Sequence, residues 1–265
     1  MVRIGLAIVI VTLLAATLGP VLTPYDPASQ ELSRRLEGPS RAHPFGRDEL
    51  GRDIMSRLMS GARISLLIGL AVVSVSSALG MLLGSMAGYF GGLVDDIISR
   101  VVDILMAFPG ILLAIALVAV LGPSLTNVVL ALSVIGWVGY ARLVRSQALR
   151  AREFEFVQAA RALGAGAPRI VLRHILPTAI PAVVVQATLG MGAAIISEAS
   201  LSFLGLGVQP PTPSWGTMLD AGRSHLFDAP HVTIFPGLAI ALLVLGFNLL
   251  GDGLRDRVDP KLAKR

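Results

Sequence analysis

The chain carries few side chains that could perform nucleophilic, acid–base or metal chemistry. Cysteine is absent, which excludes disulfides, thiolate metal ligands and a cysteine nucleophile. The sequence contains neither the metalloprotease pattern H-E-x-x-H nor the phosphate-binding pattern G-x-x-x-x-G-K-[ST]. We therefore expect no catalytic residue, no metal site and no cofactor on this chain. The four histidines are scattered over different segments: His43, His174, His225 and His231.

Glu198 is the one acid inside an otherwise apolar stretch. A charged group at membrane depth is costly and usually faces a cavity or a partner. At a helical rise of 1.5 Å per residue, the path from Pro177 to Glu198 covers about 31 Å, close to the outer edge of a bilayer. We expect a structural or gating role at an outer mouth, shared with Ser202 at i+4 and with Phe203. Direct contact with a substrate is the alternative.

Two charged triplets, Gly46-Arg47-Asp48 and Gly51-Arg52-Asp53, stand five residues apart. Opposite charges beside glycine suit a tight segment whose charges pair internally. One interpretation is a solvated turn at the membrane surface. The other is an external element that contacts another protein. The residues concerned are Gly46, Asp48, Gly51, Arg52 and Asp53.

The segment from Arg152 to Pro177 is the third polar region. Residues 153–163 predict a helix, because Phe156, Ala160 and Leu163 fall on one apolar face. A basic amphipathic helix of this kind can lie on anionic lipid.

A turn and a second short helix should follow. Gly164 stands where a C′ glycine ends a helix, and Pro168 suits the first turn of the next one. Pro177 marks the start of the following membrane span.

The elements that position these residues must be apolar helices. The chain is 54% hydrophobic and 15% charged, with a mean hydropathy of +0.75. Soluble domains are about 45–50% apolar and about 25% charged. The composition therefore excludes a soluble globular domain and indicates an integral membrane protein. The basic pI near 10.4 reflects a loop and a tail, so lipid rather than nucleic acid is the expected contact.

Charge-free runs predict six spans, since a membrane helix needs about 20 residues. The run from Ile104 to Ala141 is too long for one crossing and is divided at Gly122-Pro123-Ser124, where Ser124 can cap the next helix. The segment 203–219 is interpreted as a loop over the outer end, with Trp215 as an interface anchor. The six spans lie near 4–22, 64–87, 98–121, 125–143, 178–200 and 231–251.

Two units follow from these spans. The first, 1–63, holds one transmembrane helix and an external segment. The second, 64–265, is a five-helix core with a cytoplasmic loop at 142–177 and a cytoplasmic tail at 252–265. Cleavage of the first apolar run as a signal peptide is an open alternative.

Arginine and lysine bias sets the expected orientation. The stretch 142–173 carries seven arginines against two glutamates, so it should face the cytoplasm. An even number of spans then places both termini on the cytoplasmic side. Asp103 is expected to pair with Arg100 at i−3.

The spacing of small residues in the cytoplasmic loop is its most specific feature. Ala159-Ala160, Gly164 and Leu176-Pro177 follow the pattern A-A-x3-G-x11-L-P. This pattern resembles the "EAA" loop of ABC importer permease subunits, whose short helix docks into a groove on the ATP-hydrolysing subunit. Gln158 replaces the usual glutamate, and His174 stands where isoleucine is common. The resemblance implies a coupling role for Glu155, Gln158, Ala159, Ala160, Gly164, Leu176 and Pro177.

Three further segments resemble the peptide/nickel branch of these permeases, and within it the C-type subunit. They are 43–69, 198–219 and 249–260.

The resemblance implies an all-α integral membrane fold of the type I importer kind, with the coupling loop between spans 4 and 5. It also implies alternating-access import of di- or oligopeptides across a bacterial inner membrane. The implied partners are a second homologous permease, two ATP-binding subunits that hold ATP and Mg, and an extracytoplasmic solute-binding protein. Nickel or another small solute is the alternative cargo.

Two alternatives belong to other classes of membrane protein. An ion-coupled secondary transporter would need inverted repeats and mid-membrane charge, and neither is visible in the sequence. An intramembrane enzyme would need a paired nucleophile and base, or a metal motif, within the spans.

Overall fold

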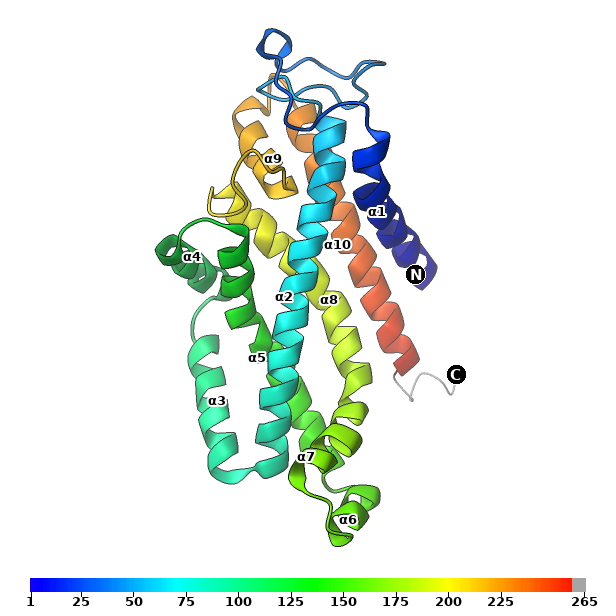
Figure 1. Ribbon diagram of the computed structural model, residues 1–265, viewed down its shortest axis with the longest axis vertical. Coiled ribbons are helices and arrows are strands. Elements are labelled where there is room, and N and C mark those ends of the chain that lie inside the picture. The colour runs from blue at the N-terminus through cyan, green and yellow to red at the C-terminus, as the bar shows by residue number, and fades with distance from the viewer. Residues whose placement is uncertain (259–265) are drawn as a thin grey trace.

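The computed structural model describes residues 1–258, and within that range the chain is helical (Figure 1). The part of the predicted tail from residue 259 onward lies outside the described residues. Short helical turns occur at Leu32–Arg34 and Arg223–His225, and a π-helical segment occupies Val171–Ile175. The α-helices are α1 Val2–Leu22, α2 Ile54–Phe90, α3 Gly92–Met106, α4 Gly110–Leu121, α5 Leu125–Ala151, α6 Glu155–Ala162, α7 Ala167–Ile170, α8 Leu176–Phe203, α9 Trp215–Gly222 and α10 His231–Val258.

Five stretches of helix are long and apolar enough to cross a membrane: α1, α2, α5, the α7–α8 stretch and α10. A sixth span exists if α3 and α4 count as one, although they are bent by 87°. The single helix predicted over 98–121 is therefore wrong. Pro109 explains the break, because proline lacks an N–H and disfavours helical geometry in the residue before it. The all-α multispan class is confirmed.

Several helices extend past the charge-free runs. The second helix begins at Ile54 rather than near 64, and α5 continues to Ala151 rather than ending near 143. Arginines lie inside both helices, because a charged side chain does not end a helix once it finds a partner or an interface. The unit boundary predicted at 63/64 thus falls inside α2. The cap expected at Ser124 is confirmed, since its side chain accepts a hydrogen bond from Asn127 N at 3.1 Å.

Helices α2 and α5 pack closely along a row of glycines. Gly80, Gly84 and Gly88 recur every four residues on α2 and face α5. A Cβ on Gly88 would lie 2.7 Å from Arg145 O, and one on Gly80 would lie 2.9 Å from Trp137 O. Small residues at this spacing let membrane helices approach closely. The pattern is visible in the sequence, but the predictions above did not use it.

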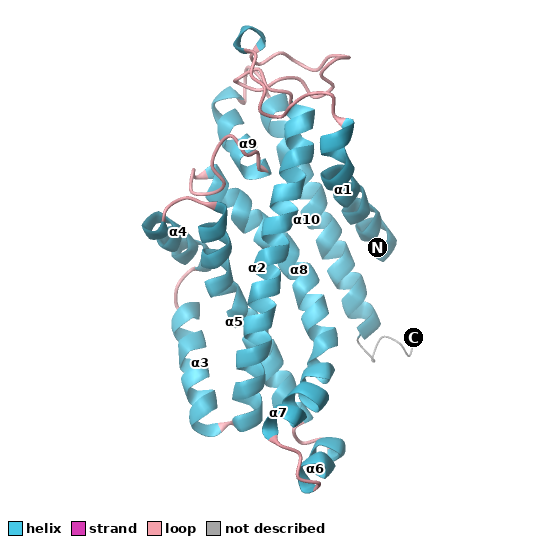
Figure 2. Cartoon of the chain, viewed as in Figure 1, coloured by secondary structure: helices cyan, strands magenta, loops and turns pink. Residues whose placement is uncertain are grey.

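Loops gather at the two ends of the molecule (Figure 2). At the capped end, residues 23–53, here called the capping segment, cover the ends of α1, α2 and α10. At the opposite end, here called the loop end, α6 and α7 project beyond the bundle (Figure 1). The start of α1 and the end of α10 lie side by side toward the loop end, with Gly5 packed against α10.

The segment 203–219 is not a loop throughout. Its last five residues, 215–219, form the start of α9, which is capped by Ser214, whose side chain accepts a hydrogen bond from Thr217 N. Trp215 is only 2% exposed, and its Nε1 donates to Leu58 O at 2.9 Å. The interface-anchor interpretation is wrong, because the indole joins α9 to α2 in the core.

Candidate functional site

The helix α6 at the loop end is anchored on the end of α5 by one fully buried side chain. Val157 is fully buried together with Ile170 and Ile175, and this group packs on Ala148 and Ala151 at the end of α5. The expected apolar face of α6 points elsewhere: Phe156 is 48% exposed and Leu163 is 88% exposed.

Several other coupling-loop residues named from the sequence are also exposed. They are Glu155, Gln158, Ala159, Gly164 and Pro177, whereas Ala160 and Leu176 are half-buried. The structure therefore places most of these residues on one projecting helix. One side of this helix packs on the end of α5, and the other side is exposed.

Gly164 ends α6 as the sequence predicted. Its φ of +82° lies in the left-handed region that favours glycine. Ala165 N donates to Ala160 O at 3.0 Å, and Gly164 N donates to Arg161 O at 3.0 Å, which closes the last turn. A Cβ at this position would meet nothing within 4 Å. The glycine is therefore required by backbone conformation and not by space.

The loop joins α8 through the π-helical segment. Pro168 lies in the first turn of α7, as expected, and Val171–Ile175 follows with no break before Leu176. Single π-turns inside α-helices are rare and occur often at functional sites. Arg161 lies over the Tyr89 ring at 5.5 Å, which ties α6 to the end of α2. The helix α6 is thus connected to two long helices, α8 and α2.

A buried polar network organises the capping segment. His43 Nδ1 lies 2.8 Å from Asp53 Oδ1, and Arg47 Nη2 lies 2.8 Å from His43 Nε2. Asp53 Oδ2 accepts from Ser56 N at 2.7 Å and thereby caps α2. Two glycines, Gly46 at φ +79° and Gly51 at φ +72°, allow the turns between these groups.

The charged triplets are internally paired but not solvated. Arg52 Nε donates to Asp48 Oδ2 at 2.7 Å, as the alternating charges suggested. Arg47, Asp48, Arg52 and Asp53 are each at most 7% exposed. The interpretation as a solvated turn is therefore wrong. The pairing takes place within the capping segment, which packs against the start of α10 through the contact of Arg47 O with His231.

Glu198 is fully buried near the capped end and holds together three elements. Ser202 Oγ donates to Glu198 Oε1 at 2.7 Å, and Ser65 Oγ from α2 donates to Oε2 at 3.2 Å. Ser214 Oγ, at the cap of α9, lies 3.5 Å from Ser202 Oγ. No lysine, arginine or histidine among the described residues pairs with the carboxyl group.

Phe203, expected beside Glu198, does not join this group. Its ring is 38% exposed and lies under Arg223 at 5.9 Å. Five residues turn an α-helix by about 140° beyond one full turn, so Phe203 points away from Glu198.

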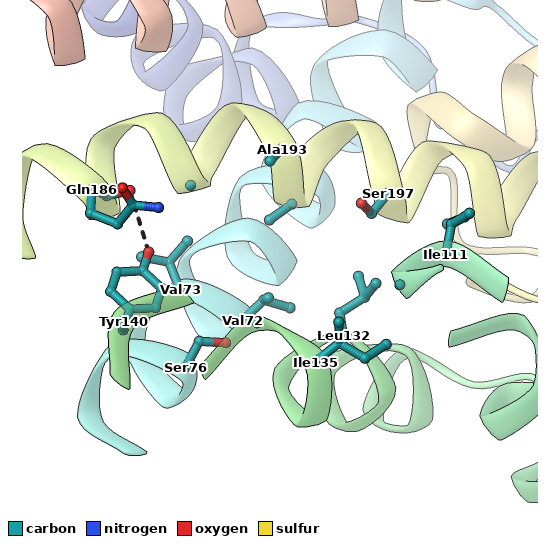
Figure 3. A pocket seen from close by; sticks show the side chains of 14 residues that line it. Val72, Val73, Ser76, Ile111, Leu132, Ile135, Tyr140, Gln186, Ala193 and Ser197 are labelled. Atoms are coloured by element: carbon teal, nitrogen blue, oxygen red, sulfur yellow. Dashed lines mark hydrogen bonds between the residues drawn. The ribbon is translucent and has the colours of Figure 1, made fainter. Parts of the chain in front are cut away.

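A cavity of about 270 Å³ lies in the middle of the bundle between α2, α4, α5 and α8 (Figure 3). Its polar groups come from Ser76, Tyr140, Gln186 and Ser197. The Tyr140 hydroxyl lies 3.5 Å from Gln186 O, while Ser76 Oγ is buried and has no hydrogen-bond partner among the described residues. The remaining lining is small or apolar: Val72, Val73, Gly110, Ile111, Leu132, Ile135, Gly136, Gly190, Ala193 and Ala194.

The ion pair expected between Arg100 and Asp103 is not formed. Instead, Asp95 on α3 pairs with Arg145 on α5, with Arg145 Nη2 donating to Asp95 Oδ2 at 2.7 Å. Both lie toward the loop end, and the pair joins two helices rather than two turns of one helix. Spacing along a single helix could not reveal this partner.

The sequence matches two protein-family models and several named proteins. Residues 80–264 match the family described as "binding-protein-dependent transport system inner membrane component", and residues 1–39 match the N-terminal transmembrane domain of oligopeptide transport permease C. A dipeptide transport system permease protein, DppC, of Alkalihalophilus pseudofirmus is 49% identical, over 98% of this chain and 85% of that protein. A glutathione transport system permease protein, GsiD, of Pectobacterium atrosepticum is 52% identical, over 91% of this chain and 80% of that protein.

A solved structure shares the fold. The MetNI methionine ABC transporter in an inward-facing conformation aligns with a TM-score of 0.62 and 20% identity, over 78% of this chain and 98% of the matched chain.

The bundle, the projecting loop and these matches define a membrane-embedded permease of an ABC importer of the peptide or glutathione type. The chain belongs to the family of binding-protein-dependent transport system inner membrane components. The expected resemblance to C-type permeases of the peptide/nickel branch is confirmed. Membership in this family excludes the ion-coupled secondary transporter.

Proposed function

We propose that this chain is one of two related permease subunits in an ATP-driven importer of di- or oligopeptides. The observation that carries the proposal is the construction of α6. Val157 fixes this helix to α5, while Phe156 and Leu163 are exposed beyond the bundle. An exposed apolar face on a firmly seated helix is suited to a groove on another subunit.

The coupling mechanism follows from the connections of α6. Two ATP-binding subunits, which hold ATP and Mg, close on nucleotide and displace the docked α6. The π-helical segment carries that displacement into α8, and the Arg161–Tyr89 contact carries it into α2. Both helices line the central cavity, so a movement at the loop end alters the path at the bundle centre. This is alternating access without chemistry on this chain.

The orientation proposed is cytoplasmic for the loop end and external for the capped end. It is supported by the arginine-rich loop under the positive-inside rule and by the placement of the α1 start and the α10 end toward the loop end. The protein then lies in a bacterial inner membrane with both termini cytoplasmic. A solute-binding protein docks at the capped end.

Peptide is favoured over nickel as cargo. The most similar relatives reported above are named for dipeptides and for glutathione, which is itself a short peptide. The central cavity offers hydroxyl and amide groups, Ser76 and Gln186 among them, which suit peptide amides. At about 270 Å³ it is smaller than a typical ligand pocket, so the second permease completes the path.

Reconstituted vesicles test this proposal. The two permeases, both ATP-binding subunits and the binding protein are inserted in liposomes, and uptake of labelled Ala-Ala, glutathione and Ni²⁺ is compared with and without ATP. We expect ATP-dependent peptide uptake that requires the binding protein. Uptake of Ni²⁺ alone would overturn the cargo assignment, and uptake by this chain without ATP-binding subunits would overturn the coupling assignment.

A further inference from the structure

A second cavity, of about 540 Å³, lies at the capped end. It is formed by the capping segment, the start of α2, the 204–214 loop and α9, and it is separate from the central cavity. Its volume falls within the range of about 300–1,000 Å³ found for small-molecule pockets. The lining residues used below are Gln30, Glu49, Arg52, Arg57, Thr212 and Asp220.

Two arginines in the wall of this cavity are paired with a single aspartate. Asp48 Oδ2 is shared by two arginines, at 2.7 Å from Arg52 Nε and 3.3 Å from Arg57 Nε. The other carboxylate oxygen, Oδ1, accepts from the backbone N–H groups of Leu50 and Arg52. Two guanidinium groups therefore share one carboxylate.

Both arginines are held in place and incompletely bonded. Arg52 is 7% exposed and Arg57 is 4% exposed. Arg57 Nε is buried without a hydrogen bond, and no hydrogen bond among the described residues ends on the terminal nitrogens of Arg52. A buried cation normally requires a full set of acceptors. Arg57 Nη1 donates to Pro27 O at 3.2 Å, so the donors left over on the two guanidinium groups include Arg57 Nε and the terminal nitrogens of Arg52.

The same cavity also carries acids. Glu49 is half-buried and makes no ion pair within the described part of the chain. Asp220 pairs only with Arg223, whose side chain is 62% exposed, and such surface pairs contribute little. The cavity thus offers fixed guanidinium groups and carboxylates together, and a ligand that carries both charges would satisfy both.

We propose that this capped-end cavity binds a short zwitterionic peptide. The free carboxylate lies on Arg52 and Arg57, where guanidinium groups provide charge-assisted donors. The α-ammonium lies toward Glu49 and Asp220. Two or three residues in extended form span about 7–11 Å, which suits the cavity. The inference rests on the proposed peptide transport, and it assigns the cavity as a receiving site ahead of the central path.

The absence of cysteine from the chain makes the test direct. Thr212 and Gln30 are exposed on two different walls, and neither side chain makes a hydrogen bond in the described structure. Thr212→Cys and Gln30→Cys are made separately in the assembled transporter without binding protein, and the rate of maleimide labelling of this chain is measured. Ser33→Cys, exposed in the capping segment but outside the cavity, is the control.

Tri-alanine, its C-terminal amide and its N-acetyl form are the probes. At ten times the dissociation constant, tri-alanine leaves about one site in eleven free, so labelling of both cavity cysteines slows about tenfold. The amide and the N-acetyl form protect less, and Ser33→Cys is unaffected. Equal protection by all three probes, or no protection by tri-alanine at either cysteine, overturns the proposal.

Charge variants complete the test. Arg52→Gln leaves one arginine for Asp48, so the fold keeps a balanced pair while protection by tri-alanine is lost. Glu49→Gln with Asp220→Asn weakens protection, and the control Glu37→Gln does not. Protection by the binding protein alone, without peptide, makes the cavity a docking surface and overturns the ligand assignment.

Failure of this inference and failure of the proposed function give different results. Peptide uptake in the vesicle assay without protection in the labelling assay rejects this site and retains the proposed function. Protection in the labelling assay without peptide uptake retains this site and rejects the proposed function.

Discussion

Ser65 on α2 and Glu198 on α8 are 133 positions apart and are joined by a hydrogen bond of 3.2 Å. Ser202 donates to the other oxygen of the same carboxyl group, and Ser214 links that serine to the cap of α9. One buried carboxyl therefore holds three elements together near the capped end. A shift of α8 against α2 must break the first of these bonds.

Glu198→Ala should destabilise the chain more than Glu198→Gln. The alanine leaves the Ser65 and Ser202 hydroxyls without partners, at a cost of about 2 kcal/mol or more. The glutamine retains hydrogen-bonding atoms and should cost less than about 1 kcal/mol, since an interhelical hydrogen bond in a membrane protein contributes about 0.6 kcal/mol. Thermal unfolding of the purified complex in detergent measures both. Equal midpoints for the two variants would contradict the network.

Gly84→Leu should prevent close packing of α2 on α5. A Cβ at this position would already lie 3.0 Å from Ala141 Cα, and the rest of a leucine has no room. We expect loss of the folded, monodisperse protein, measured by size-exclusion chromatography of a fluorescent fusion. Gly38→Leu is the matched control, because a Cβ there meets nothing within 4 Å. A normal elution profile for Gly84→Leu would contradict the packing.

Gly164→Ala and Gly164→Leu should have similar effects. The space around Gly164 is open, so the cost comes from its φ of +82° and amounts to about 1–2 kcal/mol for either side chain. That cost changes the end of α6, and we expect membrane insertion to remain while substrate-stimulated ATP hydrolysis falls. Gly122→Ala, at φ +90° in equally open space, is the control and should retain coupling. Normal coupling in the Gly164 variants would reject the docking role of α6.

The two sides of α6 should respond differently to substitution. Phe156→Ser with Leu163→Ser removes exposed apolar surface, so thermal stability stays within about 0.5 kcal/mol while co-purification of the ATP-binding subunits is lost. Val157→Ala removes two buried methyl groups and should lower stability by about 2 kcal/mol. If the exposed pair proved to be the destabilising change, the docking face would be misassigned.

The sequence was informative where a local rule applies. The cap at Ser124, the glycine at the end of α6 and the apolar spans all depend on residues close together in the chain, and each was predicted. The break at Pro109 was also a local signal but was not used, because hydropathy alone placed one span across it. The four-residue spacing of Gly80, Gly84 and Gly88 on α2 is a local signal of the same kind.

Other features depended on residues distant in sequence. The arginine partner of Asp95 lies 50 positions away on another helix, and the bond from Trp215 reaches 157 positions back to Leu58. Composition gives no means of choosing such partners. Burial of the charged triplets likewise depends on the capping segment packing against α2 and α10. Their charges predicted exposure to solvent, whereas the side chains are buried.

The π-helical segment at Val171–Ile175 has a consequence for chain length. A π-turn contains one residue more than an α-turn, so this stretch carries one residue that a plain helix would not need. Deleting a single residue there would let the stretch close as an ordinary α-helix without rotating α7 against α8, because the π-turn is where the extra residue is accommodated. A deletion in the regular part of α8 would instead turn the preceding residues by about 100° about the helix axis. The number of residues between α6 and α8, as well as their types, therefore fixes how α6 is presented.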